Sequence, residues 1–216
     1  MYKRQQSYYA KDYDWVGSIY HILEDSKGNI WMSSKGYGLI KAVADNSQNT
    51  NFRFYKYTHS ETHPYSISSN DVYLTYEDSK GRLWIGTFGG GLNLLNENNG
   101  KTPLFYNIYN DFLDYPKFGQ YREIRTLVED SKGRLWIGTT DGLMSLNGDF
   151  LQVEKIDFET YRSNITSGIT ENDVYVLYKD NSSMIWGSVF GGGLLSLNSY
   201  DAVSYTHLRA HETAAN

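Results

Sequence analysis

The sequence predicts an all-β fold built from about four small antiparallel sheets that repeat along the chain. The first observation is a phrase, EDSKGRLWIGT at residues 77–87, which returns almost letter for letter at residues 129–139. Weaker copies begin at Glu24 and Lys179. The second observation is composition: 20 Tyr, 9 Phe and 5 Trp favour strands, and 20 Gly favour tight turns. Repeated short strands joined by tight turns are typical of a structural unit that stacks on its own copies.

The repeated tryptophans measure the length of the repeat. They stand at Trp31, Trp84, Trp136 and Trp186, so successive copies are 53, 52 and 50 residues apart. A period of about fifty residues fits the blades of a β-propeller better than it fits helical repeats, which are shorter. We therefore expect a partial β-propeller of about four four-stranded antiparallel blades, arranged as an open arc. Each indole should pack between its own blade and a neighbour.

The second period shows every expected element in order. Residues 71–78 alternate apolar or aromatic with other residues and predict a strand, and the turn DSKG follows, with Asp78 at its start and Gly81 at its end. Residues 82–87 predict a second strand, which FGGG can reverse because glycine tolerates positive φ. Residues 92–96 and 102–109 predict the third and fourth strands.

The other periods repeat this order. The first reads SIYHILED, NIWMSS, GLIKAV and FRFYKY, the third reads EIRTLVED, RLWIGT, GLMSLN and FLQVEKID (150–157), and the fourth reads DVYVLYKD, MIWGSV and GLLSLN. Gly28, Gly81 and Gly133 take the same place in the first three hairpin turns. The first copy has WMSSKGYG where the second has WIGTFGGG, and the fourth has KDNSS where the others have EDSKG. We expect looser turns at these two places.

Both ends of the chain depart from the repeat. MYKRQ at residues 1–5 and VSYTHLRAHET near the other end resemble translated sequencing-library adapter. The codons TAT AAG AGA CAG for YKRQ have a reverse complement that, shifted by two bases, begins VSYT. We therefore expect residues 1–5 and 203–216 to be non-native, residues 6–202 to form the propeller, and the chain to be a fragment of a longer protein. His207 and His211 are discounted for this reason.

The repeated phrase, with EDSKG, LWIGT and GGL in this order, resembles the two-component regulator propeller repeat. The segments SISSNDVY (66–73) and GITENDVY (168–175) are similar to the segment between blades in that family. The resemblance spans residues 16–198. It implies the periplasmic sensor region of a hybrid histidine kinase of the Bacteroidetes type, part of an inner-membrane protein. Such a sensor responds to oligosaccharides and controls transcription, and its partners are a neighbouring propeller or a second copy.

Other patterns that could carry chemistry have simpler explanations. His59 and His63 are four residues apart, but Ser, Thr and Pro64 around them favour a loop over a metal-binding helix. The glycines of FGGG have no Lys-Ser/Thr pair after them, so they indicate a turn and no phosphate site. Lys80 stands where a calcium loop needs an oxygen ligand. We therefore expect no catalytic residue, no metal and no cofactor.

A segment at residues 107–122, NIYNDFLDYPKFGQYR, is an insertion relative to the other periods. It mixes aromatic with charged residues, and a long loop on a rigid scaffold is a common place for ligand binding. The predicted ligand-binding residues are Tyr109, Phe112, Tyr115, Phe118, Tyr121 and Arg122. The alternative is a loop that packs on the surface without a ligand.

Charge and composition narrow the function further. The net charge is −5 and the chain has no basic cluster, which argues against a nucleic acid partner. The chain has no Cys, so thiol chemistry and disulfides are excluded. We expect a ligand-sensing propeller without enzymatic activity. The alternatives are a propeller enzyme, either a lyase or a hydrolase, and a non-catalytic assembly scaffold.

Overall fold

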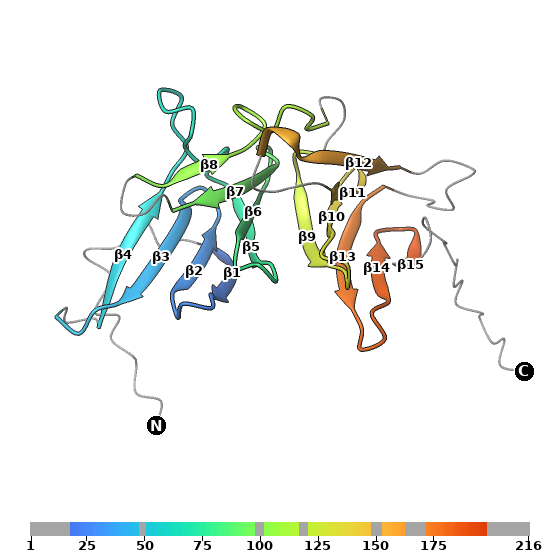
Figure 1. Ribbon diagram of the computed structural model, residues 1–216, viewed down its shortest axis with the longest axis horizontal. Coiled ribbons are helices and arrows are strands. Elements are labelled where there is room, and N and C mark those ends of the chain that lie inside the picture. The colour runs from blue at the N-terminus through green and yellow to red at the C-terminus, as the bar shows by residue number, and fades with distance from the viewer. Residues whose placement is uncertain are drawn as a thin grey trace, which may run out of the picture.

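Four antiparallel sheets follow one another along the chain and confirm the predicted partial propeller (Figure 1). The computed structural model describes residues 18–47, 51–97, 102–116, 121–147, 153–162 and 172–197. The segments 1–5 and 203–216, which we expect to be non-native, lie outside the described residues, as does Phe118. The proposed boundaries of the propeller at residues 6 and 202 stay predictions.

Each of the first three sheets has four strands, and the fourth sheet has three among the described residues. The first contains β1 (Ile19–Glu24), β2 (Ile30–Ser34), β3 (Gly38–Ala44) and β4 (Phe52–Tyr57), and the second contains β5 (Val72–Glu77), β6 (Leu83–Thr87), β7 (Leu92–Asn96) and β8 (Leu104–Tyr106). The third contains β9 (Ile124–Glu129), β10 (Leu135–Thr139), β11 (Gly142–Asn147) and β12 (Asp157–Tyr161), and the fourth contains β13 (Val174–Lys179), β14 (Ile185–Val189) and β15 (Gly193–Leu197). Within each sheet the strands are hydrogen-bonded in chain order, so each sheet is a simple meander.

Two expected fourth strands are placed differently. The strand expected at 150–157 is wrong, because the 3-10 turn η2 (Val153–Lys155) occupies that stretch and β12 begins at Asp157. Pairing of Phe158 with Leu146 sets the register and buries the Phe158 ring. The strand expected at 102–109 is only three residues long, because the buried Asn107 side chain bonds the backbone N–H of Tyr109 and turns the chain.

An aspartate organises every hairpin turn between the first and second strands of a sheet. In the second sheet, Oδ1 of Asp78 accepts from the N–H groups of Lys80 and Arg82, both at 3.0 Å. Its Oδ2 accepts from the indole N–H of Trp84 at 2.7 Å. The same indole bond joins three other pairs: Asp25 with Trp31, Asp130 with Trp136, and Asp180 with Trp186. The turn thus fixes the orientation of the tryptophan that follows it.

The two turns expected to be looser keep the common hydrogen bonds, so that expectation is wrong. In the fourth sheet Asp180 bonds the N–H groups of Ser182 and Met184, and Ser183 takes the positive φ of 67° that glycine has in the other turns. In the first sheet Ser34 Oγ donates to the Gly38 carbonyl at 2.7 Å. In the second sheet the Thr87 hydroxyl makes the equivalent bond at the same distance.

The tryptophans lie between neighbouring sheets, as predicted. Trp31 is fully buried with Leu83 and Ile85 of the second sheet, and Trp84 is fully buried with Leu135 and Ile137 of the third. Residues Val174, Leu177, Ile185 and Leu195 of the fourth sheet bury Trp136. Trp186, in the last described sheet, is half-buried. Removing one of the three buried indoles to alanine would cost about 3–5 kcal/mol.

A second contact joins neighbouring turns, and we call it the inter-blade latch. It consists of the pairs Ser26–Glu77 and Ser79–Glu129. The Glu129 carboxylate accepts from the N–H and the Oγ of Ser79, both at 2.7 Å, and Glu77 accepts from Ser26 at 2.7 and 2.6 Å. The second and third sheets therefore each supply a glutamate that binds the turn of the preceding sheet. At the equivalent position of the fourth sheet the chain has Lys179.

Candidate functional site

Much of the 107–122 segment packs into the core. Phe112, Tyr115 and Tyr121 are buried, and the rings of Phe112 and Tyr115 both contact the ring of Phe158. The Tyr115 hydroxyl donates to the Tyr121 carbonyl at 2.6 Å and accepts from the Leu92 N–H, and burial raises the pKa of this phenol. These rings fill the space between the second and third sheets, and their ligand-binding role stays a prediction.

The two remaining described residues of that prediction are exposed. Tyr109 is exposed and its ring lies beside His59. Arg122 is exposed, and its carbonyl accepts from the N–H groups of Gly89 and Gly91 at 2.9 Å. The Arg122 backbone is therefore bonded to the turn after β6, which carries Phe88.

A β-bulge stands at the same place in the first strand of all four sheets. In β1 the pairing passes from Ile19 to His21 and leaves Tyr20 unpaired. The bulged residues of the other first strands are Tyr73, Arg125 and Tyr175. A bulge redirects the side chain of the extra residue, and bulges are frequent beside binding sites. We call Tyr20, Tyr73, Arg125 and Tyr175 the bulge row.

The bulge row is continuous across the four sheets because the first strands of neighbouring sheets contact one another. The rings of Tyr20 and Tyr73 are 5.0 Å apart. The Arg125 guanidinium carbon lies 5.7 Å from the centre of the Tyr73 ring and 5.4 Å from that of Tyr175. Tyr20 is 46% exposed and Tyr175 is 49% exposed, so large parts of these rings face solvent.

Two residues outside the first strands complete the site. Phe88, in the turn after β6, is 37% exposed, and its ring centre lies 5.5 Å from the Arg125 guanidinium. Asp173, just before β13, bonds Nε and Nη2 of Arg125 at 3.3 and 3.4 Å. Burial alone would lower the pKa of Arg125, but the bonds to Asp173 outweigh this effect and raise it. The guanidinium therefore stays charged at any physiological pH.

The sequence contains a signal for the bulge row that we missed. The start of the four first strands is spanned by the triplets SIY (18–20), DVY (71–73), EIR (123–125) and DVY (173–175), and the last letter of each triplet is a bulged residue. The spacing of these bulged residues, 53, 52 and 50, equals that of the tryptophans. A position that is aromatic or cationic in every copy, at the repeat spacing, marks one location on every blade.

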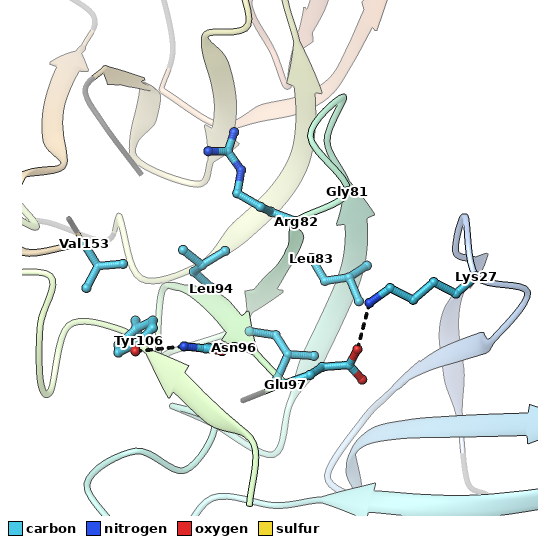
Figure 2. Close-up of a pocket in the computed structure, with 10 residues that line it drawn as sticks. Lys27, Gly81, Arg82, Leu83, Leu94, Asn96, Glu97, Tyr106 and Val153 are labelled. Carbon is cyan, nitrogen blue, oxygen red and sulfur yellow. Dashed lines mark hydrogen bonds and ion pairs between the residues drawn. The ribbon is translucent and has the colours of Figure 1, made fainter. Parts of the chain in front are cut away.

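A pocket of about 350 Å³ lies at the turn end of the second sheet (Figure 2). Leu83, Leu94 and Val153 form its apolar part. Among its polar groups, Lys27 pairs with Glu97 at 3.1 Å and Asn96 donates to the Tyr106 hydroxyl at 3.1 Å. Lys41 of β3 also pairs with Glu97. Burial raises the pKa of Glu97, but the two lysines outweigh it and hold the pKa below its ordinary value. These groups stabilise the pocket wall, and we assign no ligand to it.

The histidines of the predicted loop are separate. His59 Nδ1 lies 2.9 Å from the Ile67 carbonyl, and His63 lines a second pocket, of about 630 Å³, beside β4 and β8. Among the residues that the structure describes, no three His, Cys, Asp or Glu side chains are grouped to hold a metal ion. In the same part of the chain, no helix is long and apolar enough to cross a membrane.

The repeats match a known family. The model of the two-component regulator propeller matches residues 15–36, 66–89 and 119–141. Over these three stretches the chain is similar to the two-component regulator propeller repeat. Each match contains a bulged residue and the strand around it, since Tyr20, Tyr73 and Arg125 all fall inside the matched ranges. No curated protein matches the chain.

Solved structures share the propeller fold. The extracellular domain of BT3049 from B. thetaiotaomicron, named as a hybrid two component system, superposes with a TM-score of 0.62 at 22% identity, over 89% of this chain and 23% of that one. The extracellular domain of BT4673 from the same organism gives 0.64 at 21% identity, over 90% and 26%. Virginiamycin B lyase from Staphylococcus aureus gives 0.57 at 12% identity, over 87% and 55%. This chain therefore spans about a quarter of the two Bacteroides domains.

Proposed function

We propose that these two-component regulator propeller repeats form a ligand-sensing, extracytoplasmic region of a hybrid sensor histidine kinase, located in the periplasm, that responds to oligosaccharides and controls transcription. The observation that carries the proposal is the bulge row. It presents exposed phenol rings and a guanidinium on four neighbouring sheets. Aromatic rings stack on the apolar faces of sugars, and phenols and guanidinium supply hydrogen bonds. These groups bind a ligand without any chemical step.

The position of the row on separate sheets gives a mechanism for signalling. A ligand that contacts Tyr20 on β1 and Tyr175 on β13 touches both ends of the described arc. Its affinity then depends on the relative orientation of the sheets. A ligand shifts a conformational equilibrium only by its differential affinity for the two states. The change in sheet orientation on ligand binding would be transmitted to a neighbouring propeller or to a second copy of the chain. These are the partners that we propose.

Binding is tested by calorimetric titration of the 216-residue protein with a panel of soluble oligosaccharides. We expect at least one to bind, and we expect Tyr175→Ala to weaken binding by about tenfold, which corresponds to loss of one stacking contact. Tyr178→Ala is the matched control, because Tyr178 is a more exposed tyrosine of the same strand and lies outside the row. Equal effects of the two substitutions, or no binding by any sugar, would contradict the proposal.

The kinase connection needs a genetic test. The gene that contains this coding segment should continue, in frame, to a membrane-spanning helix and a histidine kinase. A stop codon directly after the propeller repeats would refute the sensor assignment. Mass spectrometry of the sugars after titration tests the alternative that the protein is a propeller enzyme. Cleaved sugar products would indicate a lyase or hydrolase. If substitutions in the bulge row abolished this cleavage, they would place the enzymatic activity at the row.

A further inference from the structure

The ion pair within the bulge row determines which ligands the site accepts. Asp173 binds Arg125 through two hydrogen bonds, at 3.3 and 3.4 Å, and both side chains remain partly exposed, at 27% and 19%. A guanidinium has five N–H donors and each carboxylate oxygen can accept more than one bond. Both groups therefore keep hydrogen-bonding capacity toward a ligand, while their charges compensate each other.

The ion pair lies beside the turn that carries Phe88. The backbone of Phe88, whose ring lies on Arg125, is bonded to the Asp71 carbonyl and bridged to Glu123. Asp71 and Glu123 make these contacts through their backbone atoms, and the whole chain has a net charge of −5. A ligand carboxylate that approaches Arg125 would have to compete with Asp173 and would meet its like charge, which costs free energy.

We propose that the bulge row selects neutral oligosaccharides and rejects acidic ones, an inference that rests on the proposed sensing function. The rings of Tyr73 and Tyr175 flank the guanidinium and stack on the apolar face of a sugar ring. Arg125 donates to one hydroxyl and Asp173 accepts from its neighbour, so the pair recognises two adjacent hydroxyl groups. The same Asp173 occupies the position at Arg125 that a uronate carboxylate would need.

Calorimetric titration with two classes of probe tests the selection. The neutral probes are cellotetraose, maltotetraose, mannotetraose and xylotetraose, and the acidic probe is tetragalacturonate. We expect a neutral probe to bind at least about tenfold more tightly than tetragalacturonate, a difference of about 1.4 kcal/mol. Its affinity should change little between about 25 and about 250 mM NaCl, because screening acts on charged pairs only.

Substitution of the carboxylate gives the sharper test. Asp173→Asn removes the competing charge and frees Arg125, so we expect the affinity for tetragalacturonate to rise about fivefold or more at low salt. The gain should disappear at high salt and the affinity for the neutral probe should fall. Tyr178→Ala serves as the control that leaves both affinities unchanged. Circular dichroism spectra confirm that each variant is folded.

The outcomes separate the two proposals. Tighter binding of tetragalacturonate by the unmodified protein, or an unchanged preference in Asp173→Asn, would overturn the selection while leaving the sensing function intact. If none of the probes binds, both proposals fail. A neutral preference that Asp173→Asn reduces or reverses supports both.

Discussion

Replacing Asp78 with alanine tests how one carboxylate organises a blade. Its Oδ1 holds the N–H groups of Lys80 and Arg82 in the turn, and its Oδ2 accepts from the buried indole N–H of Trp84 at 2.7 Å. The alanine variant leaves all three donors without this acceptor. Because Trp84 is fully buried, water cannot replace the lost bond without opening the core.

The cost follows from these contacts. An unsatisfied buried donor costs about 1–3 kcal/mol, and loss of a side chain that caps backbone N–H groups costs about 1 kcal/mol. The ion pair with Arg82, whose side chain is partly exposed, adds about 0–1 kcal/mol. We expect the free energy of unfolding to fall by about 3 kcal/mol. At a urea dependence of about 2 kcal/mol per molar, the unfolding midpoint should fall by about 1.5 M.

Urea unfolding followed by far-ultraviolet circular dichroism measures this change. Trp84→Phe removes the donor, so in the double variant the loss should be smaller than the sum of the two single losses by about 1–2 kcal/mol. Asp180→Ala removes the same bonds in the fourth sheet, where Trp186 is only half-buried, and should cost less. Additive losses, or equal losses in the two sheets, would refute the reasoning.

Three further predictions concern single positions. Ser79→Ala removes the 2.7 Å bond from Oγ to Glu129 in the inter-blade latch and should lower the free energy of unfolding by about 0.5–1.5 kcal/mol; an unchanged urea midpoint would contradict it. Gly38→Ala should destabilise the protein more than Gly28→Ala in the same urea assay, because a Cβ at Gly38 would lie 2.2 Å from a backbone oxygen, whereas Gly28 has open space and both have positive φ. Bonds from Ser182 and the Trp186 indole lower the pKa of Asp180 from 3.8 to about 2, so its stabilisation is complete above pH 3.8 and is lost as the pH falls toward 2. Asp180→Asn should therefore flatten the acid side of a plot of urea midpoint against pH, and an unchanged slope would disprove this.

The repeated parts of the fold were the predictable ones. The spacing of the tryptophans and the turn residues defined the first three strands of each blade, because tight turns require particular residues at particular places. The fourth strands lack such a turn signal. In the third blade the apolar run at 150–157 predicts a strand, while the pairing of Phe158 with Leu146 decides the actual register.

The candidate site was harder to predict, for a physical reason. Aromatic residues in an insertion look the same in sequence whether they bind a ligand or fill a gap, and Phe112 and Tyr115 are buried between two sheets. The spacing of the bulge row is visible in the sequence. That Arg125 lies against Tyr73 and Tyr175 depends on how separate sheets pack, which no local pattern encodes.

The inter-blade latch has a consequence for how such chains lengthen. The second copy of EDSKG contributes both halves of the latch: Glu77 accepts from Ser26 of the unit before it, and Ser79 donates to Glu129 of the unit after it. A tandem duplication of such a copy therefore supplies both the glutamate and the serine of the inter-blade latch, each already suited to the neighbouring unit. Gene segments of this kind can gain or lose a unit in a single recombination event without needing compensating mutations at the new junction.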